Sequence, residues 1–278
     1  MIPLKPFDET CREIRRLTLD CVYSIGKGHI GGCMSIVEVL TVLYFDKMNI
    51  DPKNPNMEGR DRLVVSKGHA GPAVYATLAE RGYFPKEQLR TLNKISTNLP
   101  SHCDMNKTAG IDMTTGSLGQ GFSCAVGIAT GAQIRGHDAT VYTIIGDGES
   151  QEGLVWEAAM FAAHRKLDRL IAFTDCNQMQ IDGMVDEVCG LGDLEGKWKS
   201  FGWFIQRVNG HDCAAIGAAI DRAKEQRGCP SMILLDTVKG KGLTFAEKAG
   251  PACHSMSISE EQYRSGMEEL GGGLASWK

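Results

Sequence analysis

Oxygen-bearing side chains follow two strand-like apolar runs near the middle of the chain. Residues 140–145 lead into Gly146-Asp147-Gly148, and residues 170–174 lead into Asp175-Cys176-Asn177. A helix expected over about 151–164 would join the two strands by a right-handed crossover. Asp147 and Asn177 would then emerge at the same edge of a parallel sheet. A carboxylate, an amide oxygen and a backbone carbonyl suit Mg²⁺, which completes its shell with phosphate oxygens and water. The residues therefore predict a diphosphate held through a divalent metal.

The same stretch resembles a known cofactor motif. Gly146-Asp147-Gly148, Glu157-Ala158 and Asn177 resemble the thiamine-diphosphate motif, and the form Gln151-Glu152-Gly153 resembles transketolase. The resemblance implies that the Asp147 and Asn177 side chains and the Met179 carbonyl hold the metal, as Mg²⁺ or in its place Ca²⁺ or Mn²⁺. It implies thiamine diphosphate as the cofactor.

Further cofactor contacts follow from the resemblance. Gly116-Ser117-Leu118-Gly119-Gln120-Gly121 resembles the turn that meets the aminopyrimidine ring, with serine in place of the usual proline. Gly116 and Leu118 are expected to reach that ring, and Ile181 is expected to pack against the cofactor. Gly146, Gly148 and Glu149 are assigned to cofactor binding in the same way.

Four histidines lie beside glycine or in irregular segments, in phrases that resemble the transketolase pattern. They are His29 in KGHIGG, His69 in SKGHA, His102 in LPSHCDM, and His254. The resemblance implies that His69 and His254 lie nearest the diphosphate, and that His29 and His102 lie nearest the donor carbonyl. All four are expected to bind substrate hydroxyls and to help move protons. Ser255 follows His254 where the family usually has glycine.

Three other features have competing interpretations. Glu152 is expected to join a proton relay and subunit contact near the cofactor, although a carboxylate favoured by the helix dipole would fit equally well. Lys239 and Lys241 could approach phosphate, but solvated loop lysines are the favoured interpretation. Residues 26–31 match the dinucleotide pattern G-x-G-x-x-G, yet they follow a helix instead of the strand that the pattern requires, which excludes NAD binding.

Composition limits the classes of partner. The 278 residues are 42% hydrophobic and 23% charged, as in soluble enzymes, and the net charge of −4 argues against nucleic acid. No apolar run is long enough to span a membrane, and we find no signal-peptide core. The ten cysteines show no CxxC spacing, so a zinc site is not expected. Without an export signal we expect a cytoplasmic protein.

Hydrophobic periodicity and turn residues predict alternating helices and strands. A capping box is expected from Ser259 and Gln262, and residues 94–116 show no regular pattern. Helices are expected over 8–25, from a Ser35 cap to 46, after His69 to 81, and over 119–134 and 214–226, with strands over 63–65, 204–208 and 232–238. This order predicts an α/β fold, and the resemblance implies the three-layer thiamine-diphosphate-binding form with a central parallel sheet. Residues 1–278 are expected to form one domain, with a flexible tail from about 271 to 278.

The resemblance covers residues 8 to 255, which is the first part of a transketolase. Complete transketolases continue into a pyrimidine-binding domain, which supplies a glutamate to the cofactor, and a C-terminal domain. We therefore expect the N-terminal subunit of a split transketolase, in a heterotetramer with a C-terminal partner subunit. It would transfer a two-carbon ketol unit from a ketose, expected to be phosphorylated, to an aldose; branched and sulfonated sugars stay open. A deoxyxylulose-phosphate-synthase-like enzyme and a non-catalytic relative are the alternatives.

Overall fold

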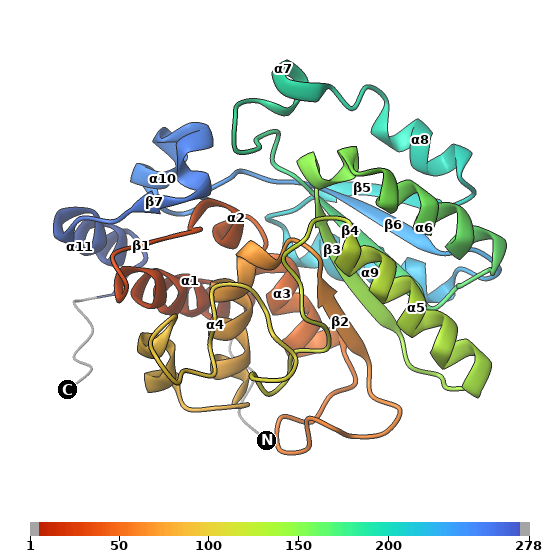
Figure 1. Cartoon of the computed structure of the whole chain (residues 1–278), viewed down its shortest axis with the longest axis horizontal. Helices are drawn as coiled ribbons and strands as arrows, with labels where there is room; N and C mark the ends of the chain where they lie inside the picture. Colours follow the sequence, from red (N-terminus) through yellow and green to blue (C-terminus); the bar gives the residue numbers. More distant parts are fainter. Residues whose placement is uncertain (1–5, 273–278) are drawn as a thin grey trace.

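A five-stranded parallel sheet forms the centre of the computed structural model, which describes residues 6–272. The strands lie in the order β2-β3-β4-β6-β5 (Figure 1). In that order they span Arg62–Val65, Val141–Gly146, Leu170–Cys176, Ser231–Asp236 and Phe204–Asn209. All seven residues of β4 are buried. Because Gly146 of β3 pairs with Asp175 of β4, the carboxyl ends of the two strands meet at one edge.

Helices cover both faces of the sheet, which confirms the predicted three layers. The core on one face contains side chains of α3, α4 and α9, with α1 packed against α3 and α4, and the core on the other face contains side chains of α5, α6 and α8. Neighbouring residues of a strand serve opposite faces: Ile144 and Phe173 belong to the first core, while Ile145 and Ala172 belong to the second. The helices span Phe7–Tyr23 (α1), Val37–Val42 (α3), Gly71–Arg81 (α4), Gln120–Arg135 (α5), Gly153–His164 (α6), Leu194–Ser200 (α8) and Cys213–Glu225 (α9).

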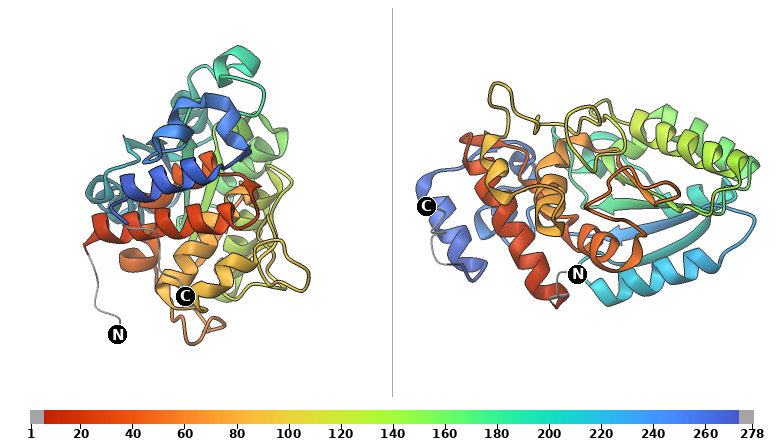
Figure 2. Two further views of the ribbon diagram at one scale, coloured as in Figure 1. Left: turned by 90° about the vertical axis from the view of Figure 1, so that its left-hand side faces the viewer. Right: turned by 90° about the horizontal axis from the view of Figure 1, so that it is seen from below.

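A smaller subassembly packs beside α1, away from the sheet (Figure 2). Its core joins α1 to α10 (Thr244–Lys248) and α11 (Glu260–Glu269). Strands β1 (Lys27–Gly28) and β7 (Met256–Ser257) form an antiparallel pair within it. His29 follows β1 and His254 precedes β7, so this short pairing brings two distant histidines together.

Several expected boundaries differ from the structure. The helix expected up to residue 46 is present, as α3 from Val37 and a π-helix (Leu43–Lys47) that continues it, but the expected Ser35 cap is wrong: Ser35 ends the short helix α2 (Gly31–Met34). The Ser35 hydroxyl instead donates to Asp175 at 2.7 Å. The strand expected to reach residue 238 ends at Asp236.

Other expectations are confirmed. Ser259 and Gln262 form the predicted capping box of α11, and residues 94–116 contain only turns and bends. The helix expected over about 151–164 is present as α6, but it starts at Gly153 because a 3₁₀ turn (Gly148–Gln151) precedes it. The remaining short helices are Gly68–Ala70, Lys86–Thr91, Val185–Cys189 (α7) and Gly250–His254. Within residues 6–272, no helix combines the length and apolarity needed to cross a bilayer. Residues 273–278 of the predicted tail lie outside the described part, and the assignment of one domain stays a prediction.

Candidate active site

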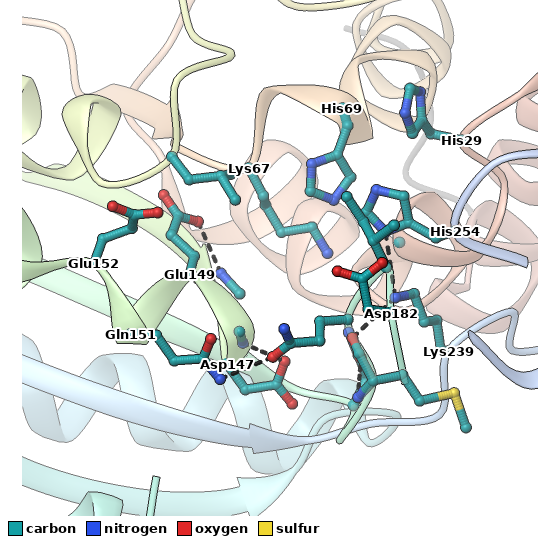
Figure 3. Close-up of a pocket in the computed structure, with 18 of the residues that line it drawn as sticks. His29, Lys67, His69, Asp147, Glu149, Gln151, Glu152, Asp182, Lys239 and His254 are labelled. Atoms are coloured by element: carbon teal, nitrogen blue, oxygen red, sulfur yellow. Dashed lines mark hydrogen bonds between the residues drawn. The ribbon is translucent and has the colours of Figure 1, made fainter. Parts of the chain in front are cut away.

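A cavity of about 340 Å³ opens where β3 and β4 end (Figure 3). Every site residue predicted from the sequence lines it. They are His29, His69, His102, Gly116, Leu118, Gly146, Asp147, Gly148, Glu149, Glu152, Asn177, Met179, Ile181 and His254. Gly32, Lys67, Gln151, Gln180, Asp182 and Lys239 line it too, and the sequence had not assigned them to the site. Their roles in binding or catalysis stay predictions at this point.

Asp147 and Asn177 lie at one corner of the cavity. The two Asp147 oxygens accept hydrogen bonds from the backbone N–H groups of Gly148, at 2.8 Å, and Gln178. Asn177 Oδ1 accepts from the Met179 N–H at 3.2 Å, which fixes the amide orientation. Asp147 and Asn177 therefore directly follow strands that the sheet holds in place, and the Met179 carbonyl lies two residues beyond Asn177.

This corner has the electrostatics of a cation site. Burial, and then the neighbouring Asp175 carboxylate, raise the pKa of Asp147 to about 6. A carboxylate whose charge is so poorly compensated gains from a bound cation. An ammonium already approaches, because Lys239 Nζ donates to the Met179 carbonyl at 2.9 Å. The donor set of one carboxylate, one amide and one carbonyl fits Mg²⁺ with phosphate and water as its other ligands.

Asp175 is a fully buried hub beneath this corner. It accepts hydrogen bonds from Ser35, Lys67, Asn177 and Thr237. Burial opposes ionisation, but the Lys67 ammonium and these donors outweigh it and hold the pKa of Asp175 below its usual value. Asp175 therefore stays charged and accepts from the Asn177 side-chain NH₂ group. This contact directs Asn177 Oδ1 away from Asp175.

Two lysines are buried in the wall of the cavity. Lys67 is 1% exposed and Lys239 is 3% exposed, so the interpretation of Lys239 as a solvated loop lysine is wrong. Burial and the nearby Lys67 charge lower the pKa of Lys239. Lys241, by contrast, does not line the cavity. Lys67 is paired with the buried Asp175 carboxylate, whereas Lys239 contacts the Met179 carbonyl and His254 Nδ1. Two buried ammonium groups beside one paired carboxylate attract an anion, as a diphosphate requires.

The position of both lysines was readable from the sequence. Lys67 comes two residues after the buried strand β2, and Lys239 comes three residues after β6. The rule that placed Asp147 at the carboxyl edge of a parallel sheet places these lysines at the same edge.

The four predicted histidines form one cluster. The His29 ring lies 5.6, 5.5 and 5.3 Å from the rings of His69, His102 and His254, measured between centroids, and His69 lies 4.8 Å from His254. Figure 3 shows three of these rings together on the side of the cavity opposite Asp147. Residues from four separate segments of the chain thus line one wall.

Burial keeps these histidines neutral. It lowers the pKa of His29, His69 and His102, and in His69 the Lys67 charge adds to the effect. Burial, and then the Lys239 charge, lower the pKa of His254 to about 4. A neutral imidazole has one donor and one acceptor nitrogen, so each ring can accept and pass on a proton.

The turn over residues 116–121 is fixed by Glu149. Its buried carboxylate accepts from the Gly119 N–H at 2.9 Å, the Gly146 N–H at 3.0 Å and the Ser66 hydroxyl. Gly119 has φ of +79°, a conformation that other residues rarely adopt. The hydrogen bonds of the Glu149 carboxylate are therefore made to the protein itself. They join the turn predicted to meet the pyrimidine ring, at Gly119, to the turn predicted to hold the metal, at Gly146.

Glu152 and Ile181 lie at the rim of the cavity. Glu152 is exposed and occupies the N-cap of α6, where its side chain makes no capping hydrogen bond. Ile181 is 65% exposed. Exposure of an apolar side chain at the mouth suits contact with a ligand or another chain.

A family model decides what kind of protein this geometry belongs to. The model described as "Transketolase, thiamine diphosphate binding domain" matches residues 8–273. The chain belongs to the transketolase family. The expected family, the three-layer fold and the assignment to its N-terminal part are thereby confirmed.

Relatives of similar length are named as subunits. The chain is 58% identical over 257 residues to the 6-deoxy-6-sulfo-D-fructose transketolase subunit SqwG of Clostridium sp. (strain MSTE9), covering 92% of this chain and 93% of the relative. It is 36% identical to an apulose-4-phosphate transketolase subunit of Phocaeicola vulgatus, covering 92% and 90%. These names support the expected N-terminal transketolase subunit.

Undivided transketolases are much longer than this chain. The human transketolase is 36% identical over 88% of this chain, which spans 39% of the human protein. A crystal structure of a Pichia stipitis transketolase mutant in complex with fructose-6-phosphate superposes with a TM-score of 0.90 at 32% identity. That match covers 97% of this chain and 41% of the Pichia stipitis chain.

Proposed function

We propose that the chain binds thiamine diphosphate through Mg²⁺ and, with a second subunit, transfers a two-carbon ketol unit from a ketose to an aldose. The observation that carries the proposal is the convergence of an oxygen-rich corner, two buried lysines and four neutral histidines on one cavity. Family membership supports the same reaction. When bound, the cofactor supplies the carbanion chemistry that cleaves and remakes the carbon–carbon bond.

The oxygen-rich corner would hold the metal and the diphosphate. Asp147, the Asn177 side chain and the Met179 carbonyl provide the protein ligands of Mg²⁺. Lys239, which contacts that carbonyl at 2.9 Å, would turn its ammonium to the diphosphate oxygens, with Lys67 behind it. The backbone at Gly146 and Gly148 permits close approach of the phosphates.

The opposite wall would bind the sugar. His29 and His102 are assigned to the donor carbonyl, and His69 and His254 to the region between substrate and diphosphate. Because burial keeps the rings neutral, each can donate to one hydroxyl and accept from another. Gly116, Leu118 and Ile181 would contact the cofactor rings.

A second polypeptide would complete the site. The chain spans 39% of the human transketolase, and Ile181 and Glu152 are exposed at the cavity mouth. Beside this mouth, α5 and α6 lie side by side (Figure 1) and expose Ile134, Leu154, Met160 and Phe161. We assign this apolar face to the C-terminal subunit, which carries the remaining domains, and expect a heterotetramer.

The proposed donor is a ketose with an anionic group at its far end. The 58% identity to a 6-deoxy-6-sulfo-D-fructose transketolase subunit, over nearly the whole of both chains, favours a sulfonated ketose over a phosphorylated one. Identity to the apulose-4-phosphate relative is lower, at 36%.

Two measurements test the proposal. Calorimetric titration of the chain with thiamine diphosphate should give heat only when Mg²⁺ is present, and a non-catalytic relative would give none. Ketol transfer should then be assayed in the presence of the C-terminal subunit, using 6-deoxy-6-sulfofructose, fructose 6-phosphate and pyruvate as donors. We expect the sulfonated ketose to react fastest and the chain alone to show no turnover. Turnover of pyruvate instead of a ketose would contradict the proposal.

A further inference from the structure

The loop that carries Lys239 into the cavity is hydrogen-bonded at both ends by residues that lie outside the cavity. We call residues 238–241 the lysine loop. At its start, the Val238 N–H donates to His211 Nε2 at 2.9 Å. At its end, the Lys241 carbonyl accepts from Arg15 Nε at 2.9 Å. Neither His211 nor Arg15 lines the cavity, so neither reaches a ligand there directly. Arg15 Nη2 also donates to the Met34 carbonyl of α2 at 3.3 Å.

One buried carboxylate joins the two holding groups. Glu38, on α3, is 7% exposed and accepts from Arg15 Nη2 at 2.8 and 2.9 Å. Its Oε2 also lies 3.1 Å from His211 Nδ1. Burial disfavours ionisation of Glu38, but the His211 hydrogen bond and the Arg15 charge outweigh it and lower the pKa of Glu38. The carboxylate is therefore ionised and orients both partners.

The hydrogen bonds define the tautomer of His211. Because the Val238 N–H donates to Nε2, this nitrogen carries no proton, and the proton of the neutral ring is on Nδ1. Nδ1 then donates to Glu38. Removal of the carboxylate would remove the acceptor that selects this tautomer, and Val238 would lose its partner whenever the proton moved to Nε2.

We propose that Glu38 is a positioning residue for diphosphate binding, acting through Arg15 and His211 to place the Lys239 ammonium. The inference rests on the proposed function, because it takes a diphosphate as the ligand of Lys239. A lysine has a long flexible stem, so a single geometry in the cavity requires a fixed backbone beneath it. The hydrogen bonds of His211 to Val238 and of Arg15 to Lys241 fix the backbone on both sides of Lys239.

The test uses inorganic pyrophosphate with Mg²⁺ as the probe and calorimetry as the measurement. In Glu38→Gln we expect the affinity to fall by about tenfold, as for other residues that orient a ligating group. Lys239→Met should also lose affinity. In the Lys239→Met background, Glu38→Gln should cause little further loss, because its effect passes through the lysine. Equal losses in both backgrounds would overturn the inference.

Asp20→Asn is the matched control. Asp20 is another buried helical carboxylate that accepts two hydrogen bonds from an arginine, Arg90, and a third from Tyr263. It does not line the cavity. This variant should lower the melting temperature as Glu38→Gln does, while its pyrophosphate affinity stays that of the wild type. A lowered affinity here would assign both effects to general destabilisation and overturn the inference.

His211 offers an independent route should Glu38→Gln fail to fold. His211→Leu removes the acceptor of the Val238 N–H and should weaken pyrophosphate binding, while His211→Gln keeps an acceptor and should restore part of it. Unchanged pyrophosphate affinity in His211→Leu would overturn this inference and leave the proposed function standing. Absence of pyrophosphate binding by the wild type would overturn the proposed function as well.

Discussion

At the scale of single residues, Asp147 links cation binding to pH. Its pKa of about 6 means that the ligand-free protein takes up a proton there as the pH falls through 6, and a bound cation competes with that proton. We therefore expect the affinity for Mg²⁺ and thiamine diphosphate to fall between pH 7.5 and 5. Calorimetry at both pH values measures this change.

Asp147→Ala should bind the cofactor at least about a hundredfold more weakly at pH 7.5, and undiminished binding would refute the metal assignment.

His254 makes the ligand-free protein sensitive to acid. Its pKa is about 4 in the folded protein and near 6.5 when unfolded, so between these values the unfolded state binds more protons. Its contribution to stability is therefore present above about pH 6.5 and is lost as the pH falls towards 4. Urea unfolding at pH 7.5 and 5 should show a smaller loss of stability on acidification in His254→Gln than in the wild type. An equal loss would contradict the low pKa.

At the scale of elements, the turn before α5 depends on glycine. Gly119 has φ of +79°, and a Cβ there would lie 3.1 Å from Cβ of Glu152. Gly119→Ala should lower the free energy of unfolding by about 1–3 kcal/mol, measured by urea denaturation. Gly127, in the same helix, is the control, because a Cβ would meet nothing within 4 Å. Gly127→Ala should be neutral or stabilise by up to about 1 kcal/mol; a loss as large as that of Gly119→Ala would refute the strain argument.

Strand ends were the most predictable part of the site. Asp147 and Asn177 follow apolar runs, and a parallel sheet brings all such ends to one edge, so their proximity follows from the sequence. The same rule applies to Lys67, but a lysine after a strand is usually solvated, and its burial depends on Asp175. Local signals also misplaced Ser35, because its hydroxyl bonds a residue 140 positions away. Tertiary partners of that kind have no signature in the neighbouring sequence.

The cluster of four histidines was likewise only partly predictable from the sequence. The resemblance assigned four histidines to one site, but no periodicity in the sequence predicts the β1–β7 pair that brings His29 to His254. Each of these strands has only two residues, too few for a pattern to show.

At the scale of the whole molecule, the exposed face of α5 and α6 is expected to bind the partner subunit. Leu154 and Phe161 are seven residues apart on α6 and so project from one side, with Met160 beside them. Exposed apolar groups that gather in this way typically mark an interface. Phe161→Asp should therefore leave the chain folded, with normal Mg²⁺-dependent cofactor binding, but should abolish ketol transfer and co-elution with the C-terminal subunit.

Ile95 provides the control for this prediction. It is 99% exposed, in the irregular segment that precedes α5, and it lies outside both the cavity and the α5–α6 face. Ile95→Asp adds the same charge to the surface and should leave co-elution and transfer unchanged, as size-exclusion chromatography and a donor–acceptor assay can measure. A partner that still binds Phe161→Asp with wild-type affinity must dock elsewhere. Loss of binding in both variants would point to the added charge, and not to the apolar face, as the cause.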